Sequence, residues 1–402
     1  MDRTILHSDI NSCFASVERL YRPELAGKPF AVCGDAELRH GIVLAKSEEA
    51  KRAGVKTAMA IWQAKQVCPE LITVKPHYDR YEKYSKMIRQ IYSEYTDMVE
   101  PFGIDECWLD ITNCYACPDA AKTAQEIRKR VRSETGLTVS VGVSWNKVLA
   151  KLGSDYKKPD AVTVISRENF RELAWGLPAN DMIMVGRSTM RVLRAMGIFT
   201  IGELAAAPPE LLKARLGKCG VMLGLYANGI DNSRVRRIGE REPPKSIGNS
   251  TTAAHDIESI GQARHTLLML SDTVASRLRR EGYMCRTIEL SLRYTDLTWR
   301  SHRMRLEQAT DITSELLHCG TELLRESHEF PTPLRSMGIR ALELANSTAD
   351  EQMSLFTDQE SRDKERRIDL AVDRIREKYG AESIGRCSLM GEYSAGFCSL
   401  PD

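Results

Sequence analysis

Two adjacent acids, Asp105 and Glu106, lie within the apolar stretch PFGIDECWLD. An unpaired carboxylate removed from water is costly, so two neighbouring acids in such a stretch suggest a shared binding role. Neighbouring side chains of a regular strand point to opposite faces, so the backbone must turn here if both acids serve one site. The preceding PFG supplies residues that favour a turn. A third acid, Asp9, ends a predicted strand at 3–9.

If the strands that carry these acids are neighbours, three carboxylates meet at one end of a sheet. They can coexist there only beside cations, and a site of hard oxygen ligands without His or Cys favours Mg²⁺. Two such ions about 4 Å apart can activate an attacking oxygen and stabilise a leaving oxygen in phosphoryl transfer. The spacing alone leaves an alternative open, in which Asp105 caps a turn and Glu106 points to solvent.

The composition narrows the class of protein. A chain of 402 residues, 42% apolar and 28% charged, predicts a soluble globular protein of two to four domains. The 57 basic and 55 acidic residues nearly cancel, so affinity for nucleic acid must come from local patches. No run of 18 apolar residues and no leader is present, which argues against a membrane span or secretion.

Cysteine usage favours a reducing cytoplasm, because the eleven cysteines form no regular disulfide framework. Cys114 and Cys117 form one CxxC, but a zinc site would need a second pair at a matching distance, and the sequence has none. Ordinary thiols are therefore a better interpretation of this pair than zinc binding or redox chemistry.

The first 165 residues alternate predicted strands and helices, which indicates an α+β sheet with helices on one face. An irregular stretch at roughly 22 to 77 interrupts this pattern after the first helix, 12–21, which we expect to begin behind a cap at Asn11 or Ser12. Residues 166–232 are predicted to be all-helical, with Thr200 and Glu203 at the spacing of a capping box.

The stretch 233–245 is basic, contains two prolines and is predicted to be a linker. Beyond it, CRTIELSLRY alternates, with Ile288, Leu290 and Leu292 on one face, as in a half-buried antiparallel strand. Eight arginines and three acids lie between Arg277 and Arg305. They fit either a solvated face or a face that binds a sugar-phosphate backbone. The tail after 346 is polar, apart from a short apolar island and a final helix, RIDLAVDRIREKYG.

Six motifs occur in order, and together they resemble the Y-family translesion DNA polymerases, in particular the bacterial DNA polymerase IV-like group. The first five are SDINSCFASVE (8–18), AKSEEAKRAGVKT (45–57), GIDECWLDIT (103–112), SVGVSWNKVLAKLGSDYKKPD (140–160) and VGRSTMRVLRAMGIFTIGEL (185–204). The sixth, KSIGNSTT (245–252), resembles the opening of the DNA-binding domain that this family calls the little finger. The resemblance covers about residues 4 to 380.

The resemblance implies an α+β multi-domain right-hand polymerase. Its implied parts are a ferredoxin-like palm (1–21 and 78–165), small fingers (22–77), a helical thumb with a helix-hairpin-helix-like segment (166–232), a linker (233–245), an antiparallel α+β little finger (246–345) and a tail (346–402). It further implies a monomeric, cytoplasmic, low-fidelity lesion-bypass polymerase without a proofreading exonuclease. Such an enzyme acts in DNA repair and damage tolerance, on primer-template DNA and deoxynucleoside triphosphates.

The resemblance also implies roles for single residues. Asp9, Asp105 and Glu106 would hold two Mg²⁺ ions, with the carbonyl of Ile10 as a further ligand. Phe14 matches the aromatic steric gate of the D-x-x-x-x-F/Y pattern, whose ring leaves no room for a 2′-hydroxyl on the incoming sugar. The alternative for Phe14 is a core residue of the first helix.

Ser47, Lys51 and Lys158 are the implied contacts to the triphosphate. Lys51 stands where the family usually has Arg, and it cannot form a bidentate fork. Glu48 stands where the family usually has a Tyr whose hydroxyl contacts the triphosphate, so its charge should repel the phosphates. The alternative is that Glu48 points into solvent or pairs with Arg52, one helical turn further along.

Other implied contacts lie beyond the palm and the fingers. Met184 stands where some relatives have a Gly that approaches the DNA backbone. The expected DNA-binding residues of the little finger and its start are Lys245, Ser246, Arg286, Arg293, Arg303 and Arg305. The peptide Gln352, Met353, Ser354, Leu355 and Phe356 resembles the segment by which bacterial polymerases bind the sliding clamp, with Met353 in place of the usual Leu. It is a small apolar hook suited to a groove on a partner.

Two other functions were weighed. A catalytically silent relative that only binds DNA and the clamp should have lost metal-binding acids, yet all three remain. A nucleotidyl cyclase-like enzyme on a similar sheet would lack the hairpin segment, the arginine-bearing C-terminal sheet and the clamp peptide.

Overall fold

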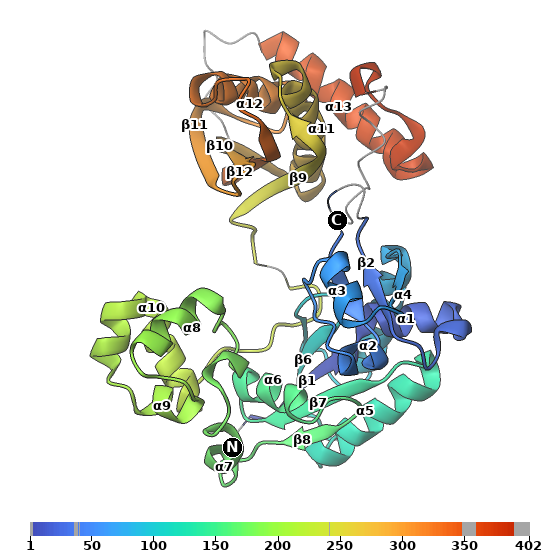
Figure 1. Cartoon of the computed structure of the whole chain (residues 1–402), viewed down its shortest axis with the longest axis vertical. Coiled ribbons are helices and arrows are strands. Elements are labelled where there is room, and N and C mark those ends of the chain that lie inside the picture. The colour runs from blue at the N-terminus through green and yellow to red at the C-terminus, as the bar shows by residue number, and fades with distance from the viewer. Residues whose placement is uncertain (1–2, 36–38, 40, 241, 348–358, 390–402) are drawn as a thin grey trace. The chain divides into compact units, whose positions relative to one another are not determined.

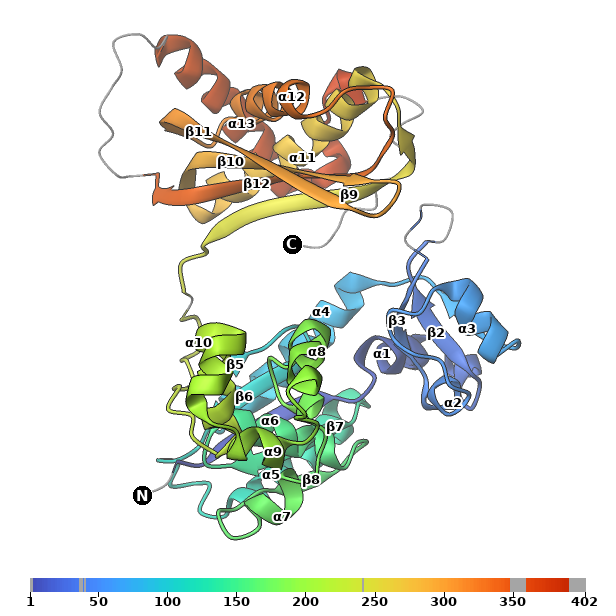
Figure 2. The ribbon, with the colours of Figure 1, turned by 60° about the vertical axis from the view of Figure 1, so that its left-hand side comes forward.

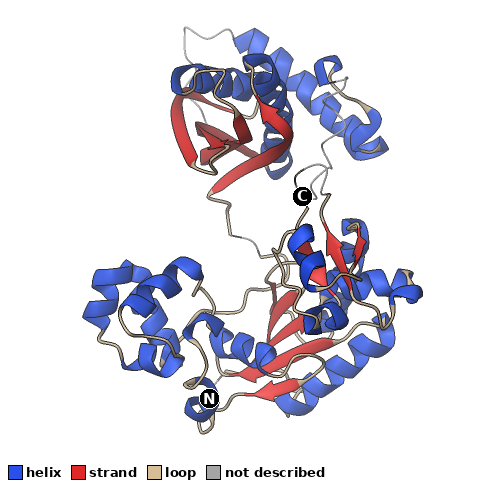
Figure 3. Ribbon diagram, viewed as in Figure 1, coloured by secondary structure: helices blue, strands red, loops and turns tan. Residues whose placement is uncertain are grey.

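The computed structural model describes residues 3–35, 39, 41–240, 242–347 and 359–389 (Figure 1). It contains mixed helices and strands (Figure 3), as the predicted α+β class requires. The chain divides into two compact units. One consists of residues 1–34 and 42–241, and the other of residues 35–41 and 242–402.

A five-stranded sheet forms the centre of the first unit, with the strand order β5-β6-β1-β7-β8. The central strand β1 (Ile5–Ile10) pairs antiparallel with β6 (Glu106–Asp110) on one side and with β7 (Val139–Ser144) on the other. The edge strands are β5 (Val99–Pro101) and β8 (Val162–Val164). The first residue of β6 therefore lies beside the last residues of β1.

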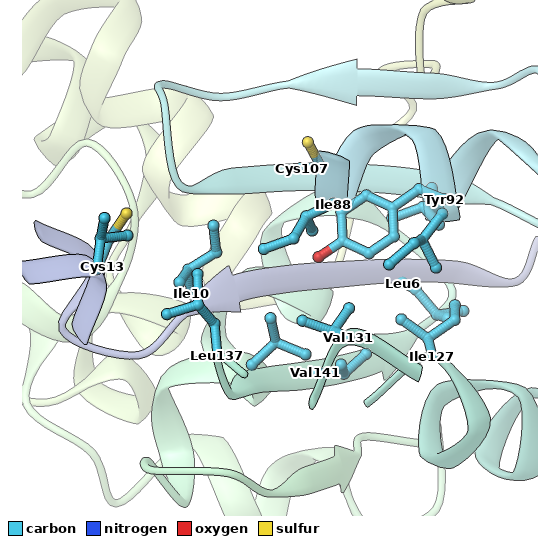
Figure 4. Packing of buried hydrophobic residues seen from close by; sticks show 14 of the residues in the cluster. Leu6, Ile10, Cys13, Ile88, Tyr92, Cys107, Ile127, Val131, Leu137 and Val141 are labelled. Atoms are coloured by element: carbon cyan, nitrogen blue, oxygen red, sulfur yellow. The ribbon is translucent and has the colours of Figure 1, made fainter. Parts of the chain in front are cut away.

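Helices cover both faces of this sheet, so the expectation of helices on one face is wrong. On one side α4 (Tyr78–Ser93) and α5 (Ala120–Thr135) pack on a core that includes Leu6 and Ile10 of β1 (Figure 4). On the other side lies α6 (Lys147–Tyr156). Its Ala150 packs with Ile5 and Trp108, because alternate strand residues face opposite ways. The sequence pattern could not reveal this second layer, since a strand that is buried on both faces shows no alternation.

The contact between α6 and the sheet is close because position 142 is glycine. A Cβ atom built on Gly142 would lie 1.9 Å from the carbonyl oxygen of Ala150 and 2.4 Å from the backbone nitrogen of Ser154. No side chain fits in that space. Gly142 is also the register partner of His7 on β1, so this contact brings the middle of α6 beside the strand that carries Asp9.

The first helix of the unit, α1 (Cys13–Tyr21), follows β1 directly. Ser12 occupies the predicted N-cap position, but its side chain makes no capping hydrogen bond. Its backbone is left-handed, with φ of 47°, and its hydroxyl donates to Glu48 Oε1 at 3.3 Å. The side chain of Asn11 contacts Thr138 and Ser140 on the neighbouring strand region. The predicted cap position is therefore confirmed at Ser12, but its side chain does not supply the capping hydrogen bond.

The stretch that looked irregular in the sequence, 22–77, contains a small sheet of its own, with the order β3-β2-β4. Its elements are η1 (Pro23–Leu25), β2 (Phe30–Cys33), β3 (Val43–Lys46), α2 (Glu48–Arg52), α3 (Ile61–Val67) and β4 (Ile72–Val74). Strands of three or four residues are too short to show a period in the sequence.

Residues 166–232 are helical, as predicted. The helices are α7 (Phe170–Ala174), η2 (Ala179–Asp181), α8 (Arg187–Ala195), α9 (Ile201–Ala206) and α10 (Pro209–Ala227). The predicted capping box is present, since Thr200 and Glu203 each bind the backbone of the other. Met184, just before α8, is left-handed with φ of 70°, a conformation that costs every residue other than glycine some free energy.

The first half of the predicted linker is bound to the five-stranded sheet. Val235 is fully buried, and Ile238 donates its N–H to the carbonyl of Asp97 at 3.0 Å. Arg236 donates from both its backbone N and its Nη2 to the Glu100 carboxylate, at 3.0 and 2.8 Å. This segment has little apolar periodicity, and it is held in place by the buried acid Glu100 and by the buried side chain of Val235.

The second unit contains a four-stranded antiparallel sheet, ordered β11-β10-β12-β9 (Figure 2). Its strands are β9 (Ser246–Ile257), β10 (Tyr283–Tyr294), β11 (Trp299–Thr310) and β12 (Leu334–Asn346). The helices α11 (Ile260–Glu281) and α12 (Thr313–Ser327) pack on one face, against Ile288, Leu290 and Leu292. The alternation predicted for β10 is confirmed.

The predicted final helix is present as α13 (Gln359–Tyr379), which begins eight residues before the expected start at 367. The extra residues lack apolar periodicity. Ion pairs hold them, from Arg362 to Glu315 and from Arg366 to Asp311. The short helices η3 (Ala381–Ser383) and η4 (Cys387–Leu389) follow. Within the described ranges, no helix has the length and apolar character that crossing a membrane would require.

Candidate active site

The three acids come together because of strand pairing. Asp9 is the register partner of Glu106 across the β1–β6 ladder, and side chains at paired positions lie on the same face. Asp105 lies just before β6, and its carbonyl accepts the N–H of Ile10 at 3.0 Å. Because Asp105 lies outside the strand, the alternation of strand side chains does not force it onto the face opposite to that of Glu106.

The turn before these acids is held by α4. Gly103 adopts φ of 85°, which glycine allows. Arg89 donates from Nη2 to the carbonyl of Gly103 at 2.7 Å, and the Ser85 hydroxyl donates to the carbonyl of Ile104. Two side chains of one helix thus fix the backbone that presents Asp105.

The electrostatics of the acids reflect their crowding. Burial, with the neighbouring carboxylates of Glu106 and Asp105, raises the pKa of Asp9 against the opposing ammonium of Lys158. Burial and the charge of Glu106 raise the pKa of Asp105 as well. Burial would also raise the pKa of Glu106, but hydrogen bonds from His7 and Lys151 outweigh it and lower that pKa. The two aspartates are thus only partly compensated by positive charge, whereas Glu106 is already compensated by two neighbouring donors.

Two lysines of α6 and the residues after it supply that charge. Lys158 Nζ lies 2.6 Å from Asp9 Oδ2 and 2.6 Å from Asp155 Oδ1. Lys151 Nζ lies 2.5 Å from Glu106 Oε2. Both ammonium groups therefore lie beside the carboxylates that would bind a cation, at a place where they could also contact a phosphate.

The residues fit a divalent metal in their chemistry, because the donors are carboxylate oxygens on one face of two paired strands. Among the residues that the structure describes, no group of three or more His, Cys, Asp or Glu side chains is already arranged to hold an ion. Two of the carboxylate oxygens, Asp9 Oδ2 and Glu106 Oε2, are bound by Lys158 and Lys151. Ile10, the predicted carbonyl ligand, is the last residue of β1 and pairs with Val139.

Phe14 lies on α1 beside this site, in a stack of aromatic rings. Its ring stacks on Tyr81 with a centroid distance of 4.1 Å and an interplanar angle of 10°. Tyr78 meets it edge-on at 5.8 Å. Tyr81 is itself fixed, because its hydroxyl donates to the fully buried carboxylate of Glu18 at 2.6 Å. Phe14 is therefore a half-buried ring on a rigid support.

The predicted triphosphate residues at α2 differ in their surroundings. The buried Ser47 hydroxyl accepts from the N–H groups of Phe30 and Ala50 and donates to the carbonyl of Lys28, all within 3.2 Å. It caps α2 and supports β2. Lys51 is more than half exposed.

Glu48 has two polar neighbours in the structure. It lies 3.7 Å from Lys51 Nζ and accepts a hydrogen bond from Ser12. The alternative pairing of Glu48 with Arg52 is not the one found, since the partner is Lys51, three residues along the helix.

The open face of the second unit's sheet carries the predicted arginines. Arg303 pairs across the strands with Glu289, which pairs in turn with Arg340 on β12. The Arg303 Nε to Glu289 Oε2 distance is 2.6 Å, and Arg340 Nη1 lies 3.6 Å from Glu289 Oε1. In the next row of this face, Arg305 pairs with Thr287.

The remaining predicted DNA-binding residues have different positions. Arg293 pairs with Trp299 and lies over its ring at 5.4 Å. Ser246 begins β9, with the exposed Lys245 before it. Arg286 lies at the β-bulge between Cys285 and Thr287 and is half-buried.

Two motifs need a separate statement. The clamp-like peptide, 352–356, lies outside the described residues. Cys114 and Cys117 have their sulfur atoms 2.7 Å apart, with Cys117 buried and Cys114 half-buried. As with the acids, no third ligand for a metal accompanies this pair in the described ranges.

Sequence reasoning missed several side chains that complete the site: His7, Ser85, Arg89, Tyr81 and Lys151. His7 was hidden in an apolar strand, where a lone histidine is usually a core residue. Lys151 had a signal, since it lies in the same motif as Lys158, seven residues before it, on the predicted helix that leads to Lys158.

Comparison with known proteins gives consistent results. The family model described as impB/mucB/samB family matches residues 8–155, and the model of that family's C-terminal domain matches residues 244–355. "DNA polymerase IV" of Acetivibrio thermocellus is 46% identical over 391 residues, which cover 97% of this chain and 98% of that protein. "DNA polymerase IV 1" of Bacillus subtilis is 39% identical, with 95% of this chain and 92% of that protein covered.

One solved structure, a Y-family DNA polymerase chimera, matches with a TM-score of 0.73 and 23% identity. The match covers 85% of this chain and 99% of that chain. This likeness shows a shared fold and confirms the predicted fold class.

Proposed function

Since this chain belongs to the impB/mucB/samB family of Y-family DNA polymerases, we propose how its residues carry out template-directed DNA synthesis. The enzyme is a DNA-directed DNA polymerase of the translesion type. We assign the reaction to the end of the five-stranded sheet, with 1–21 and 78–165 as the palm, 22–77 as the fingers and 166–232 as the thumb. Residues 246–345 are the little finger.

One observation carries this assignment: Asp9 and Glu106 are register partners, with Asp105 at the adjoining turn. The raised pKa values of Asp9 and Asp105 support the proposal, because a bound cation would stabilise the charged forms of both carboxylates. Two Mg²⁺ ions bound there would activate the primer 3′-hydroxyl and neutralise the charge that develops on the triphosphate.

The protein's own residues then bind and orient the reactants. Lys158 lies 2.6 Å from Asp9, so it can exchange that carboxylate for a phosphate oxygen without moving far. Lys51, more than half exposed on α2, can turn toward the same phosphates. Ser47 acts through structure, because its cap holds α2 in place. The contribution of these residues is positioning and charge, as phosphoryl transfer requires.

Sugar selection is assigned to Phe14. A ring that stacks on Tyr81, itself fixed by Glu18, cannot yield when a 2′-hydroxyl approaches. A flexible side chain at this place would accommodate the extra oxygen, so the rigid support is the basis for discrimination.

The open face of the little finger is assigned to the DNA backbone. Arg303 and Arg305 are 64% and 77% exposed, so they keep most of their contact with solvent and can meet phosphates. The peptide 352–356 is assigned to a sliding clamp, on its sequence alone.

The central experiment is single-nucleotide primer extension with Mg²⁺ and each deoxynucleotide in turn, on undamaged and lesion-bearing templates. Addition directed by the template base is expected. A chain that binds the primer-template but adds no nucleotide with either Mg²⁺ or Mn²⁺ would refute the catalytic assignment.

The clamp assignment has its own test. Deletion of 352–356 should leave distributive synthesis unchanged and remove stimulation by a loaded bacterial sliding clamp, because tethering acts through effective concentration. Stimulation of the deletion variant equal to that of the full chain would contradict the assignment.

A further inference from the structure

We propose that His7 is a positioning residue which, together with Lys151, fixes the carboxylate of Glu106 through one of its two oxygens. Glu106 is then presented as a ligand through its other oxygen. The proposal rests on the assignment of Glu106 as a metal ligand, and it explains a buried histidine that nothing else in the fold requires.

Both donors contact the same carboxylate oxygen. His7 Nε2 lies 3.1 Å from Glu106 Oε2, and Lys151 Nζ lies 2.5 Å from that same atom. A carboxylate has two oxygens. Because Oε2 of Glu106 accepts two contacts, the carboxylate group can rotate little about its terminal bond. Oε1 is the oxygen that remains for an ion.

The other ring nitrogen of His7 is bound as well. Nδ1 lies 2.8 Å from the hydroxyl of Ser154 on α6. A carboxylate only accepts hydrogen bonds, so Nε2 must carry the hydrogen that faces Glu106. The Ser154 hydroxyl also lies 2.7 Å from the carbonyl oxygen of Lys151, so its one hydrogen is shared between that oxygen and Nδ1. When the hydroxyl donates to Nδ1, Nε2 is the protonated nitrogen of a neutral ring.

The ring itself has no freedom to turn. His7 is completely buried, and it meets Trp108 edge-on with a centroid distance of 5.2 Å. Its register partner is Gly142, where the absence of a side chain lets α6 bring Ser154 into contact. The imidazole is thus held on three sides by a ring, a hydroxyl and the closely packed helix.

A core-filling role would be served better by an apolar residue, because burying imidazole costs free energy unless both nitrogens are bound. Both are bound here, and one of the partners is a proposed metal ligand. Lys151 alone would not fix the direction of the carboxylate, since an ammonium on a flexible stem acts as a point charge. The rigid ring supplies the direction that the lysine lacks.

The test uses the full chain bound to a primer-template that ends in a dideoxynucleotide, with the correct deoxynucleotide present. Mn²⁺ is titrated and its binding is followed by electron paramagnetic resonance, so the readout does not depend on catalysis. Two substitutions separate the two ring nitrogens. His7→Gln can place its amide near Nε2 and keep the donor to Glu106, whereas His7→Asn reaches only the position of Nδ1.

We expect His7→Asn to weaken Mn²⁺ binding by about 10-fold or more, as the loss of a residue that orients a metal ligand typically does. His7→Gln should stay within about threefold of the natural protein, and Ser154→Ala should fall between the two, on the same scale. Ser8→Ala is the matched control, since Ser8 adjoins His7 on β1 but faces Tyr92 on the opposite side of the sheet. It should leave Mn²⁺ binding unchanged.

Equal Mn²⁺ affinity in the Asn and Gln variants would overturn the proposal, as would a loss in the Asn variant that merely follows a loss of DNA binding. Circular dichroism melting of each variant identifies any that fail to fold, and the Gln and Ser154 variants keep the comparison decisive in that case. Glu106→Gln separates the two levels of the argument. If that variant binds Mn²⁺ as the natural protein does, the proposed metal site itself is wrong. If it does not, and the His7 variants are all alike, only the role of His7 is wrong.

Discussion

The two main sheets of the molecule handle charge in opposite ways. At the end of the five-stranded sheet, Asp9 is 6% exposed and is bound by one lysine at 2.6 Å. On the open face of the four-stranded sheet, Arg303 and Arg305 are mostly exposed; Arg303 has its acid partner, Glu289, on the paired strand β10, and Arg305 lies 3.8 Å from Glu343 on β12. In the first arrangement a few charges are fixed at definite positions. In the second, many exposed charges are available to a partner, and none of them has to contact one particular atom of it.

Burial is the physical cause of the difference. A buried charge is costly unless a specific partner compensates for it, so each charged group at the end of the five-stranded sheet depends on its neighbours. An exposed charge is stabilised by water and weakened by salt, so the loss of one is tolerated. Substitutions should therefore have large and specific effects in the first region and small, additive, salt-dependent effects in the second.

The largest effect is expected for Asp105→Asn, which keeps the shape of the side chain and removes the charge. Loss of one metal-binding acid should cost several kcal/mol of transition-state stabilisation, or about 1,000-fold or more in the rate of single-nucleotide addition. Binding of primer-template should stay within about twofold, because the acid does not attract DNA. Rapid-quench kinetics and fluorescence anisotropy give the two numbers, and a variant that keeps a tenth of the rate would contradict the assignment.

The second effect concerns the sugar of the incoming nucleotide. Phe14→Ala should reduce discrimination against ribonucleotides by at least about tenfold, or ~1.4 kcal/mol, because the ring that excludes the 2′-hydroxyl is gone. Phe14→Tyr keeps a ring on Tyr81 and serves as the control. The measurement is the ratio of kcat/KM for matched deoxy- and ribonucleotides. A ratio that changes less than twofold in the Ala variant would make Phe14 a core residue only.

The third effect tests the exposed region. Arg303→Ala with Arg305→Ala should weaken DNA binding by about tenfold at low salt and reduce the slope of log Kd against log salt by about two. The rate of addition at saturating DNA should not change. Arg325→Ala on α12 is the matched control, an exposed arginine paired with Glu322 on the helical side of the same sheet.

A substitution that is expected to strengthen DNA binding complements this test. Glu289 is only 9% exposed in its side chain, between Arg303 and Arg340. Glu289→Gln removes the one carboxylate that both arginines share, so DNA binding should tighten by about threefold at low salt. Weaker binding would mean that Glu289 holds the arginines in place for DNA.

The smallest effect is expected at Glu48, whose side chain is one-third exposed and thus intermediate between the buried acids and the exposed arginines. Glu48→Gln should lower the KM for the nucleotide by about twofold, because the variant frees Lys51 and removes a repelling charge. Glu48→Tyr should lower it further by adding a hydroxyl donor. The effect should shrink as salt rises, since the charge is partly screened. An unchanged KM in both variants, measured at two salt concentrations, would place Glu48 away from the triphosphate.

The candidate site could be located from the sequence because its signals are local. Asp105 and Glu106 are conspicuous within an apolar stretch, and the turn they require is announced by PFG. The alternation of Ile288, Leu290 and Leu292 is equally local, and it identified the open face of the second sheet correctly.

The remaining features depend on contacts that are distant in sequence. The partner of His7 is Ser154, 147 residues away, and no spacing links them. The helix on the second face of the sheet could not be placed, because β1 is buried on both faces and shows no alternation. The small sheet at 22–77 was missed for a different reason, since its strands are too short to carry a period.

The close packing at Gly142 has a consequence for inherited variation. A side chain at this position would push α6 away from the sheet, and α6 carries Lys151 and Ser154 and leads directly to Lys158. A substitution there would touch no reactant, yet it would displace three polar groups at once and have the same effect as replacing one of the proposed catalytic acids. Genetic screens that select for loss of lesion bypass should therefore recover substitutions of this glycine as well as substitutions of the three acids.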